Sequence, residues 1–437
     1  MTVAPASTVV SAPSALRAPG YAWCIVGAVV CNVLAGNSFR LGLPIGPDRV
    51  LMAAGLTLLL LDAEPWRRLR LRWQGVHVVM LLLVLLTVLS ALAAGTLTTS
   101  YGLFALLDRL VIPFLLFCLA PVIFDNAAAR RLLLAGLTAL ALYLGFTAIF
   151  EIVRPQALVF PRYIIDPLVG IQFGRARGPF IASEAMGLAL FQTGLVAAYA
   201  TTVYTGARRL LAAAAAGSCA LGVFLTLTRS IWVGSVLGLI LIGVKQPALR
   251  RRLPLIVVGI AATLAVAVAV VPGLQAQVSE RAGTTRSVYD RQNTNAAALR
   301  IIEERPLTGV GWVRFIDVSR DYVRQADTYP VTNVEIEVHN VVLSRAAELG
   351  VLGAALWVLA VLMGPVRAAL SRTRADLRGW QLAQLGGLVC WGVSVLLSPV
   401  PYPFPNLAVF LLAGLVLTPK LVAPRAGSRV PAAFEQG

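Results

Sequence analysis

Ionisable side chains gather at the ends of long apolar runs in this sequence. Arg175 and Arg177 directly precede an apolar run, and Glu184 lies in its first turn. Arg229 stands in a short turn between two further runs, and His339 enters another. Charged groups at such positions are costly in a membrane and mark function by default. These residues are therefore the starting point for a functional hypothesis.

Arginine and histidine side chains together suit phosphate-centred chemistry. A guanidinium group pairs with phosphate through two parallel hydrogen bonds, so Arg175, Arg177 and Arg229 suit the pyrophosphate head of a lipid whose tail lies in the bilayer. A neutral imidazole at His339 is a candidate general base. Nearby arginines would keep its pKa low, because they repel the imidazolium form.

Two more charged pairs lie close to the same ends of the apolar runs. Asp108 and Arg109 stand shortly after the start of one run, and Arg345 and Glu348 share one helix face by their spacing. A packed structural ion pair is an equally good interpretation of Asp108 and Arg109, and it is the favoured interpretation of Arg345 and Glu348. We expect them to support the candidate site rather than to react.

Metal binding is a competing hypothesis for the same segment. The pattern Glu335-x-Glu337-x-His339 places three possible ligands on one side of an extended segment. No second histidine or any cysteine joins this group, as a typical metal site would require. We therefore predict neither a metal nor any other cofactor.

The composition places the chain in a membrane. Hydrophobic residues make up 58% of the 437 residues and charged residues only 13%, about half the charged share of a typical soluble domain. The net charge is +17, but the basic residues are scattered over short segments between apolar runs. That distribution follows the positive-inside rule and argues against nucleic acid as a partner.

Apolar runs long enough to cross a bilayer predict an all-α, polytopic transmembrane bundle with about twelve spans. The expected spans are 21–39, 48–61, 76–94, 103–124, 132–152, 181–204, 210–227, 231–244, 255–271, 341–363, 380–399 and 405–419. With a cytoplasmic N-terminus, the inner segments hold twenty basic residues and the short outer loops three. This predicts the cytoplasmic (inner) membrane, both termini in the cytoplasm, and the candidate site on the extracytoplasmic side.

The expected organisation has five parts. They are a cytoplasmic tail (1–20), nine spans (21–271), one large extracytoplasmic loop (272–340), three spans (341–419) and a second cytoplasmic tail (420–437). Within the loop, 295–305 is predicted to form a helix that Asn293, Thr294 or Asn295 caps and Pro306 ends. A turn over 308–312 should follow.

Four stretches of the sequence resemble one known family in their order and spacing. They are Arg175-Ala-Arg-Gly-Pro-Phe180, Leu225-Thr-Leu-Thr-Arg229-Ser230, Arg300-Ile-Ile-Glu-Glu-Arg-Pro306-Leu-Thr-Gly309-Val-Gly311, and His339-Asn340-Val-Val-Leu343 with Glu348 and Gly350 behind it. This set, over residues 170–360, is similar to the bacterial O-antigen ligase and O-antigen polymerase superfamily.

The resemblance implies a C-type glycosyltransferase fold and inverting, metal-independent glycan transfer. The donor would be a glycan on undecaprenyl pyrophosphate, and the acceptor a sugar hydroxyl of a glycan or glycolipid. Arg177 or Arg175, together with Arg229, would bind pyrophosphate, and His339 would activate the acceptor. Asp108, Arg109, Asn340, Arg345 and Glu348 would support them.

Two questions stay open at this point. Ligase and polymerase use the same donor and cannot be separated from this sequence. The main alternative is a transporter or flippase of a polyprenyl-linked or anionic substrate, because intramembrane charges also suit that class. Against it, the charges crowd one side and the two halves of the chain do not match.

Overall fold

A computed structural model describes residues 17–153, 156–247, 250–251, 258, 275–276, 286–326, 329–332 and 335–425. The two expected tails fall mostly outside these residues. The ninth expected span, 255–271, lies outside them except for residue 258.

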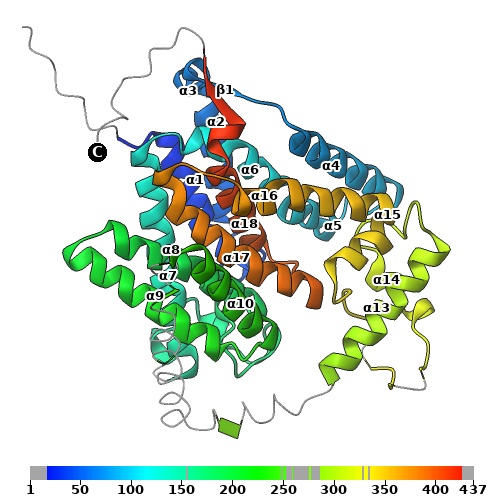
Figure 1. The fold of residues 1–437 in the computed structure, drawn as a ribbon. Coiled ribbons are helices and arrows are strands. Elements are labelled where there is room, and N and C mark those ends of the chain that lie inside the picture. The colour runs from blue at the N-terminus through cyan, green and yellow to red at the C-terminus, as the bar shows by residue number, and fades with distance from the viewer. Residues whose placement is uncertain are drawn as a thin grey trace, which may run out of the picture.

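A helix stands at each of the other eleven expected spans (Figure 1). These helices are α1 (Gly20–Cys31), α2 (Pro47–Leu61), α4 (Gly75–Ala93), α5 (Ser100–Leu106) continued by α6 (Ile112–Ile123), α7 (Ala127–Ile152), α8 (Ser183–Val203), α9 (Gly206–Leu225), α10 (Arg229–Lys245), α15 (Val341–Val361), α17 (Arg378–Leu397) and α18 (Pro403–Val416). Among the described residues, seven helices are long and apolar enough to cross a membrane. A multi-pass helical membrane protein is thereby confirmed, while the count of twelve spans stays a prediction.

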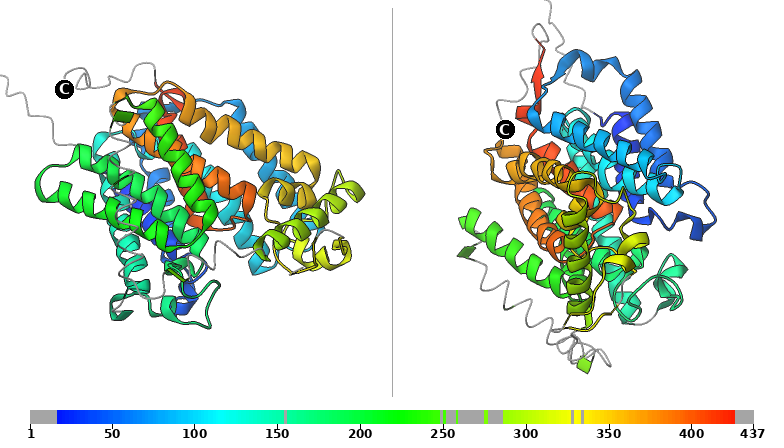
Figure 2. Two further views of the ribbon diagram at one scale, coloured as in Figure 1. Left: turned by 60° about the horizontal axis from the view of Figure 1, so that its bottom comes forward. Right: turned by 90° about the vertical axis from the view of Figure 1, so that its right-hand side faces the viewer.

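Further helices lie in the connections between these spans. They are α3 (Ala63–Arg68), α13 (Arg286–Glu304), α14 (Phe315–Tyr322), α16 (Arg367–Leu370) and α19 (Thr418–Leu421). Helices α13 and α14 belong to the expected outer loop and pack beside the start of α15 (Figure 2).

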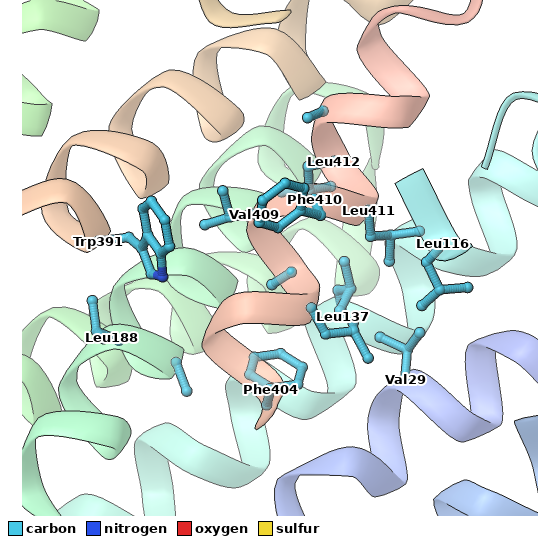
Figure 3. Packing of buried hydrophobic residues seen from close by; sticks show 14 of the residues in the cluster. Val29, Leu116, Leu137, Leu188, Trp391, Phe404, Val409, Phe410, Leu411 and Leu412 are labelled. Carbon is cyan, nitrogen blue, oxygen red and sulfur yellow. The ribbon is translucent and has the colours of Figure 1, made fainter. Parts of the chain in front are cut away.

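The core of the bundle is built around α18. Its residues from Phe404 to Val416 are all buried, and it packs against α6, α17 and α8. Figure 3 shows Phe410 of α18 near Trp391 of α17, with Leu116 of α6 on the other side. At 1.5 Å per residue its fourteen residues span only about 21 Å. Such a short helix, apolar on all sides, fits a position surrounded by protein.

Within the described residues, the structure departs from the all-α prediction at one place. Strands β1 (Leu69–Leu71) and β2 (Val422–Pro424) pair antiparallel. Each strand follows a short helix that ends a membrane-spanning region, so two connecting segments lie side by side and satisfy each other's main-chain groups.

Segments predicted to share a side of the membrane contact one another. On the expected inner side, Arg130 pairs with Asp376 at 3.1 Å and Arg68 with Asp125 at 3.2 Å, next to the β1–β2 pair. On the expected outer side, the 94–102 segment contacts the large loop. The grouping agrees with the predicted alternation of spans, and which end faces the cytoplasm remains a prediction.

Candidate functional site

The membrane helix α15 is interrupted at Gly350, which has φ +74°. The turn that follows α13 docks onto this interruption through three main-chain hydrogen bonds: Val310 N to Ala347 O (2.9 Å), Gly311 N to Glu348 O (3.0 Å) and Val351 N to Pro306 O (2.8 Å). The break frees carbonyl groups of α15, and the turn satisfies them. The third and fourth sequence motifs are therefore parts of one structural unit.

Glycine is required where these two backbones meet. A Cβ atom on Gly309 would lie 2.5 Å from the Ala347 oxygen, and one on Gly350 would lie 2.1 Å from the Leu307 oxygen. Both glycines also have positive φ, a region that other residues rarely adopt. The spacing of glycines in the sequence thus reports a close approach of the loop to the membrane helix.

The loop helix α13 begins nine residues earlier than the sequence predicted. It covers Arg286–Glu304 rather than 295–305, although it ends before Pro306 as expected. The predicted capping residues lie inside it and are tied to the rest of the loop. Asn293 Nδ2 donates to the Pro330 carbonyl at 2.9 Å, and Thr294 Oγ1 lies 3.5 Å from His339 Nδ1. Tertiary contacts in the loop extend the helix beyond its local signals.

His339 is half-buried beside α13. Burial lowers the pKa of its imidazole below the ordinary range, and the Arg291 guanidinium lowers it further, while Asp290 acts to raise it. The ring is therefore neutral at physiological pH, as a general base must be. The sequence predicted that arginine would depress this pKa, but burial contributes more, and the arginine is Arg291.

Arg291 joins the loop helix to the membrane helices. Its Nε donates to the Leu397 carbonyl at the end of α17, at 2.9 Å. Burial lowers the pKa of Arg291, Glu184 raises it and Arg229 lowers it, so its charge lies within reach of both side chains. Sequence reasoning missed this residue, because the predicted helix began after it. The three-residue spacing of Arg291 and Thr294, which places both on one helix face, was the signal that could have identified Arg291.

Arg175 and Arg229 come from two segments that meet. The N–H of Ala176 donates to the Leu225 carbonyl at 3.0 Å, and the Ser183 and Thr228 hydroxyls lie 3.0 Å apart. Arg229 begins α10, where the helix dipole favours anions. Arg229 is exposed and Arg175 is 8% exposed. The first two sequence motifs are thus adjacent in space.

Arg177 is turned into its own loop. Its guanidinium is 0% exposed. It donates to the carbonyls of Ile164 (2.7 Å), Val169 (2.7 Å) and Asp166 (3.0 Å), and it pairs with Glu151 at 3.5 Å. These contacts organise the 156–180 segment. The sequence left Arg175 and Arg177 as alternatives for binding pyrophosphate, and Arg175 is therefore the better candidate of the two.

The predicted supporting residues divide into separate contacts. Asp108 pairs with Arg49 rather than with its neighbour Arg109, which pairs with Glu337 at 2.6 Å. Both residues lie in a π-helical turn, Leu107–Val111, that joins α5 to α6. Such a turn rotates consecutive side chains away from regular helical positions, so the two side chains serve different partners.

The remaining supporting residues stabilise the start of α15. Arg345 pairs with Glu348 at 3.1 Å, as their spacing predicted, and its guanidinium lies 4.7 Å from the centre of the Trp312 ring. Asn340 caps α15, since its Oδ1 accepts from Leu343 N at 3.1 Å. Its amide also donates to the Leu396 carbonyl at 3.3 Å, which places the segment carrying His339 beside the end of α17.

The carboxylates of the alternative metal-site hypothesis, Glu335 and Glu337, pair with different arginines in this structure. Glu335 pairs with Arg320 and Glu337 with Arg109. In the part of the chain that the structure describes, no three His, Cys, Asp or Glu side chains are grouped for a metal ion.

Comparison with known proteins assigns the region that carries most of these contacts. Residues 212–358 match the family model described as O-antigen ligase. This match supports the O-antigen ligase and polymerase superfamily as the family that the chain resembles. The match includes Arg229, Arg291, His339 and the interrupted part of α15, and it confirms the resemblance inferred from the four motifs. No curated protein matches the chain.

The match to the O-antigen ligase family model supports glycosyl transfer by a membrane enzyme on lipid-linked glycans. Arg175, Arg177 and the Asp108–Arg109 turn lie outside the matched residues, so their roles rest on the geometry described above.

Proposed function

We propose that this protein transfers a glycan from undecaprenyl pyrophosphate to an acceptor sugar hydroxyl at the extracytoplasmic face of the inner membrane. The observation that carries the proposal is that Arg291 and the segment carrying His339 both donate hydrogen bonds to the end of α17, Arg291 to the Leu397 carbonyl and Asn340 to the Leu396 carbonyl. Arg291 also lies in electrostatic range of both His339 and Arg229.

In this mechanism, the arginines act on the leaving group. Arg229 and Arg175 bind the pyrophosphate, and Arg291 adds positive charge beside it. Fixed positive groups stabilise the negative charge that develops as the glycosidic bond breaks, without requiring a metal. Arg177 holds the 156–180 segment in place and acts on Arg175 indirectly.

His339 removes the proton from the acceptor hydroxyl. The hydroxyl oxygen attacks the anomeric carbon, the bond to pyrophosphate breaks, and the configuration inverts. General-base assistance of this kind is worth about 10²–10⁴-fold in rate. The lowered pKa of His339 keeps its accepting nitrogen unprotonated under ordinary conditions.

The test is glycan transfer in proteoliposomes supplied with a defined undecaprenyl-pyrophosphate glycan. Wild-type protein should form product, whereas His339→Ala and Arg229→Ala should insert normally and form none. Transfer by both variants at the wild-type rate would overturn the mechanism.

A transporter or flippase is the second candidate, and the interrupted helix α15 favours it. Broken membrane helices next to charged pairs are typical of transport sites, and Gly350 lies beside the buried Arg345–Glu348 pair. Movement of a labelled lipid-linked glycan across vesicles without product formation would support transport.

In cells, a deletion strain separates the two enzymatic alternatives, ligase and polymerase. Single repeat units accumulate if a polymerase is lost, and full-length polymer accumulates on its carrier if a ligase is lost.

A further inference from the structure

Glu337 lies two residues before His339, yet its carboxylate is held by a distant part of the chain. Its Oε1 accepts hydrogen bonds from Arg109 Nη2 and from the Tyr101 hydroxyl, both at 2.6 Å. The same guanidinium donates to the Tyr101 hydroxyl at 3.0 Å. The Arg109 and Glu337 side chains are only 7% and 20% exposed, and shielding from water strengthens such charge-assisted contacts.

Holding the Glu337 carboxylate in place fixes the main chain two residues before the candidate base. The His339 Nδ1 atom lies 3.5 Å from Thr294 Oγ1, and the Thr294 hydroxyl donates its own hydrogen to the Asp290 carbonyl at 3.0 Å, so the ring N–H donates to this hydroxyl oxygen. A ring nitrogen that donates to a fixed oxygen sets the tautomer and leaves the other nitrogen free to accept a proton. Catalytic histidines are commonly oriented in this way.

The elements that hold Glu337 are themselves fixed. Tyr101 and Arg109 lie on α5 and on the π-helical turn after it. The same hairpin binds the loop at Trp312, whose Nε1 donates to the Gly102 carbonyl at 3.1 Å and whose carbonyl accepts from Thr96 Oγ1 at 3.0 Å. The α4–α5 hairpin and the turn after it therefore bind the outer loop at two residues, Trp312 and Glu337, and Glu337 is close in sequence to His339.

We infer that Glu337 is a positioning residue, through which Arg109 and Tyr101 set the orientation of the His339 imidazole. The inference rests on the proposed role of His339 as the base. It adds two residues, Glu337 and Tyr101, to those predicted from the sequence, and it gives Arg109 a specific task. The carboxylate stays charged while the imidazole titrates. Burial alone would raise the pKa of Glu337, but Arg109 and the Tyr101 hydroxyl lower it below its usual range.

The orientation of His339 can be measured without any activity. The sequence contains only two histidines, His77 and His339, so ¹⁵N-histidine solid-state NMR in liposomes gives two sets of ring signals, which His339→Ala assigns. In wild-type protein, His339 should show one tautomer. In Glu337→Gln, it should show mixed tautomers and a shifted titration midpoint, and kcat for transfer should fall about 10- to 100-fold with an unchanged KM for the donor.

Milder variants guard against misfolding. Tyr101→Phe removes one of the two hydrogen bonds and should give smaller changes in the same direction, whereas Arg109→Lys should retain part of the wild-type behaviour. The matched control is Glu335→Gln, which breaks the exposed ion pair with Arg320 in the same segment and should change neither the His339 signals nor the rate.

Two results would be decisive. Wild-type His339 signals and an unchanged pH profile in both Glu337→Gln and Tyr101→Phe would overturn the inference. If Glu337→Gln alters the His339 signals but the wild-type protein transfers no glycan, the proposed function is contradicted while the orienting contact is supported. The two failures can therefore be told apart.

Discussion

A Cβ atom on Gly350 would lie 2.1 Å from the main-chain oxygen of Leu307. This contact joins the interrupted membrane helix α15 to the turn that ends the outer loop. It accounts for the presence of both glycine-containing motifs in one sequence, since a Cβ atom at Gly309 or at Gly350 would clash with the backbone of the other segment.

Gly350→Ala should therefore destabilise the protein and detach the turn. The clash and the positive φ together should cost about 1–3 kcal/mol or more, and thermal unfolding in detergent measures the loss. Gly392→Ala is the matched control. A Cβ there meets nothing within 4 Å, and the residue lies within the membrane helix α17. An equal melting temperature for both variants would contradict the account.

The sequence predicted most of the helices because each membrane span carries its own apolar signal. It predicted the Arg345–Glu348 pair from helical spacing. It did not predict that α13 starts at Arg286, because the contacts of Asn293 and Thr294 are made with a segment some forty residues away. For the same reason it missed Arg291 and the link between Glu337 and Arg109, which depend on how the loop folds back onto the bundle.

Arg177→Ala should act through the structure of the 156–180 segment. Removing the guanidinium leaves one buried and two partly buried carbonyls without their donor and the buried Glu151 without its cation, which should cost about 3–5 kcal/mol. Limited proteolysis should cut this segment faster. Arg177→Lys should not restore protection, because a single ammonium cannot reach the same carbonyls. Arg162→Ala, at an exposed position of the same segment, should leave the cleavage rate unchanged.

The pH dependence of transfer should follow His339. Its pKa is lowered, so the neutral form that accepts a proton persists into mildly acidic solution, and the rate should fall only as the pH drops through that lowered value. Arg291→Gln removes a charge that lowers this pKa, so the acidic limb should move to higher pH. Arg291→Lys keeps the charge and should leave the limb near its wild-type position. A limb that does not move in Arg291→Gln would exclude His339 as the titrating group.

Membrane orientation can be tested with single cysteines in a variant that lacks the five native ones. Leu168 is 92% exposed in the 156–180 segment, and Arg372 stands in the connection between α16 and α17. In intact cells a membrane-impermeant maleimide should label Leu168→Cys but not Arg372→Cys, and lysis should expose both. The reverse pattern would place the candidate site in the cytoplasm and contradict the positive-inside assignment.

The most direct test of the central claim is the rate of glycan transfer by purified His339→Ala in proteoliposomes that contain undecaprenyl-pyrophosphate-linked glycan and acceptor. Loss of a general base should reduce kcat by about 10²–10⁴-fold while donor binding, measured separately, stays intact. His77→Ala should retain the wild-type rate, because this histidine lies in the first turn of α4, where its Nδ1 accepts from Gln74 N, beside the segment that carries Lys420. A wild-type kcat in His339→Ala would show that another group removes the acceptor proton.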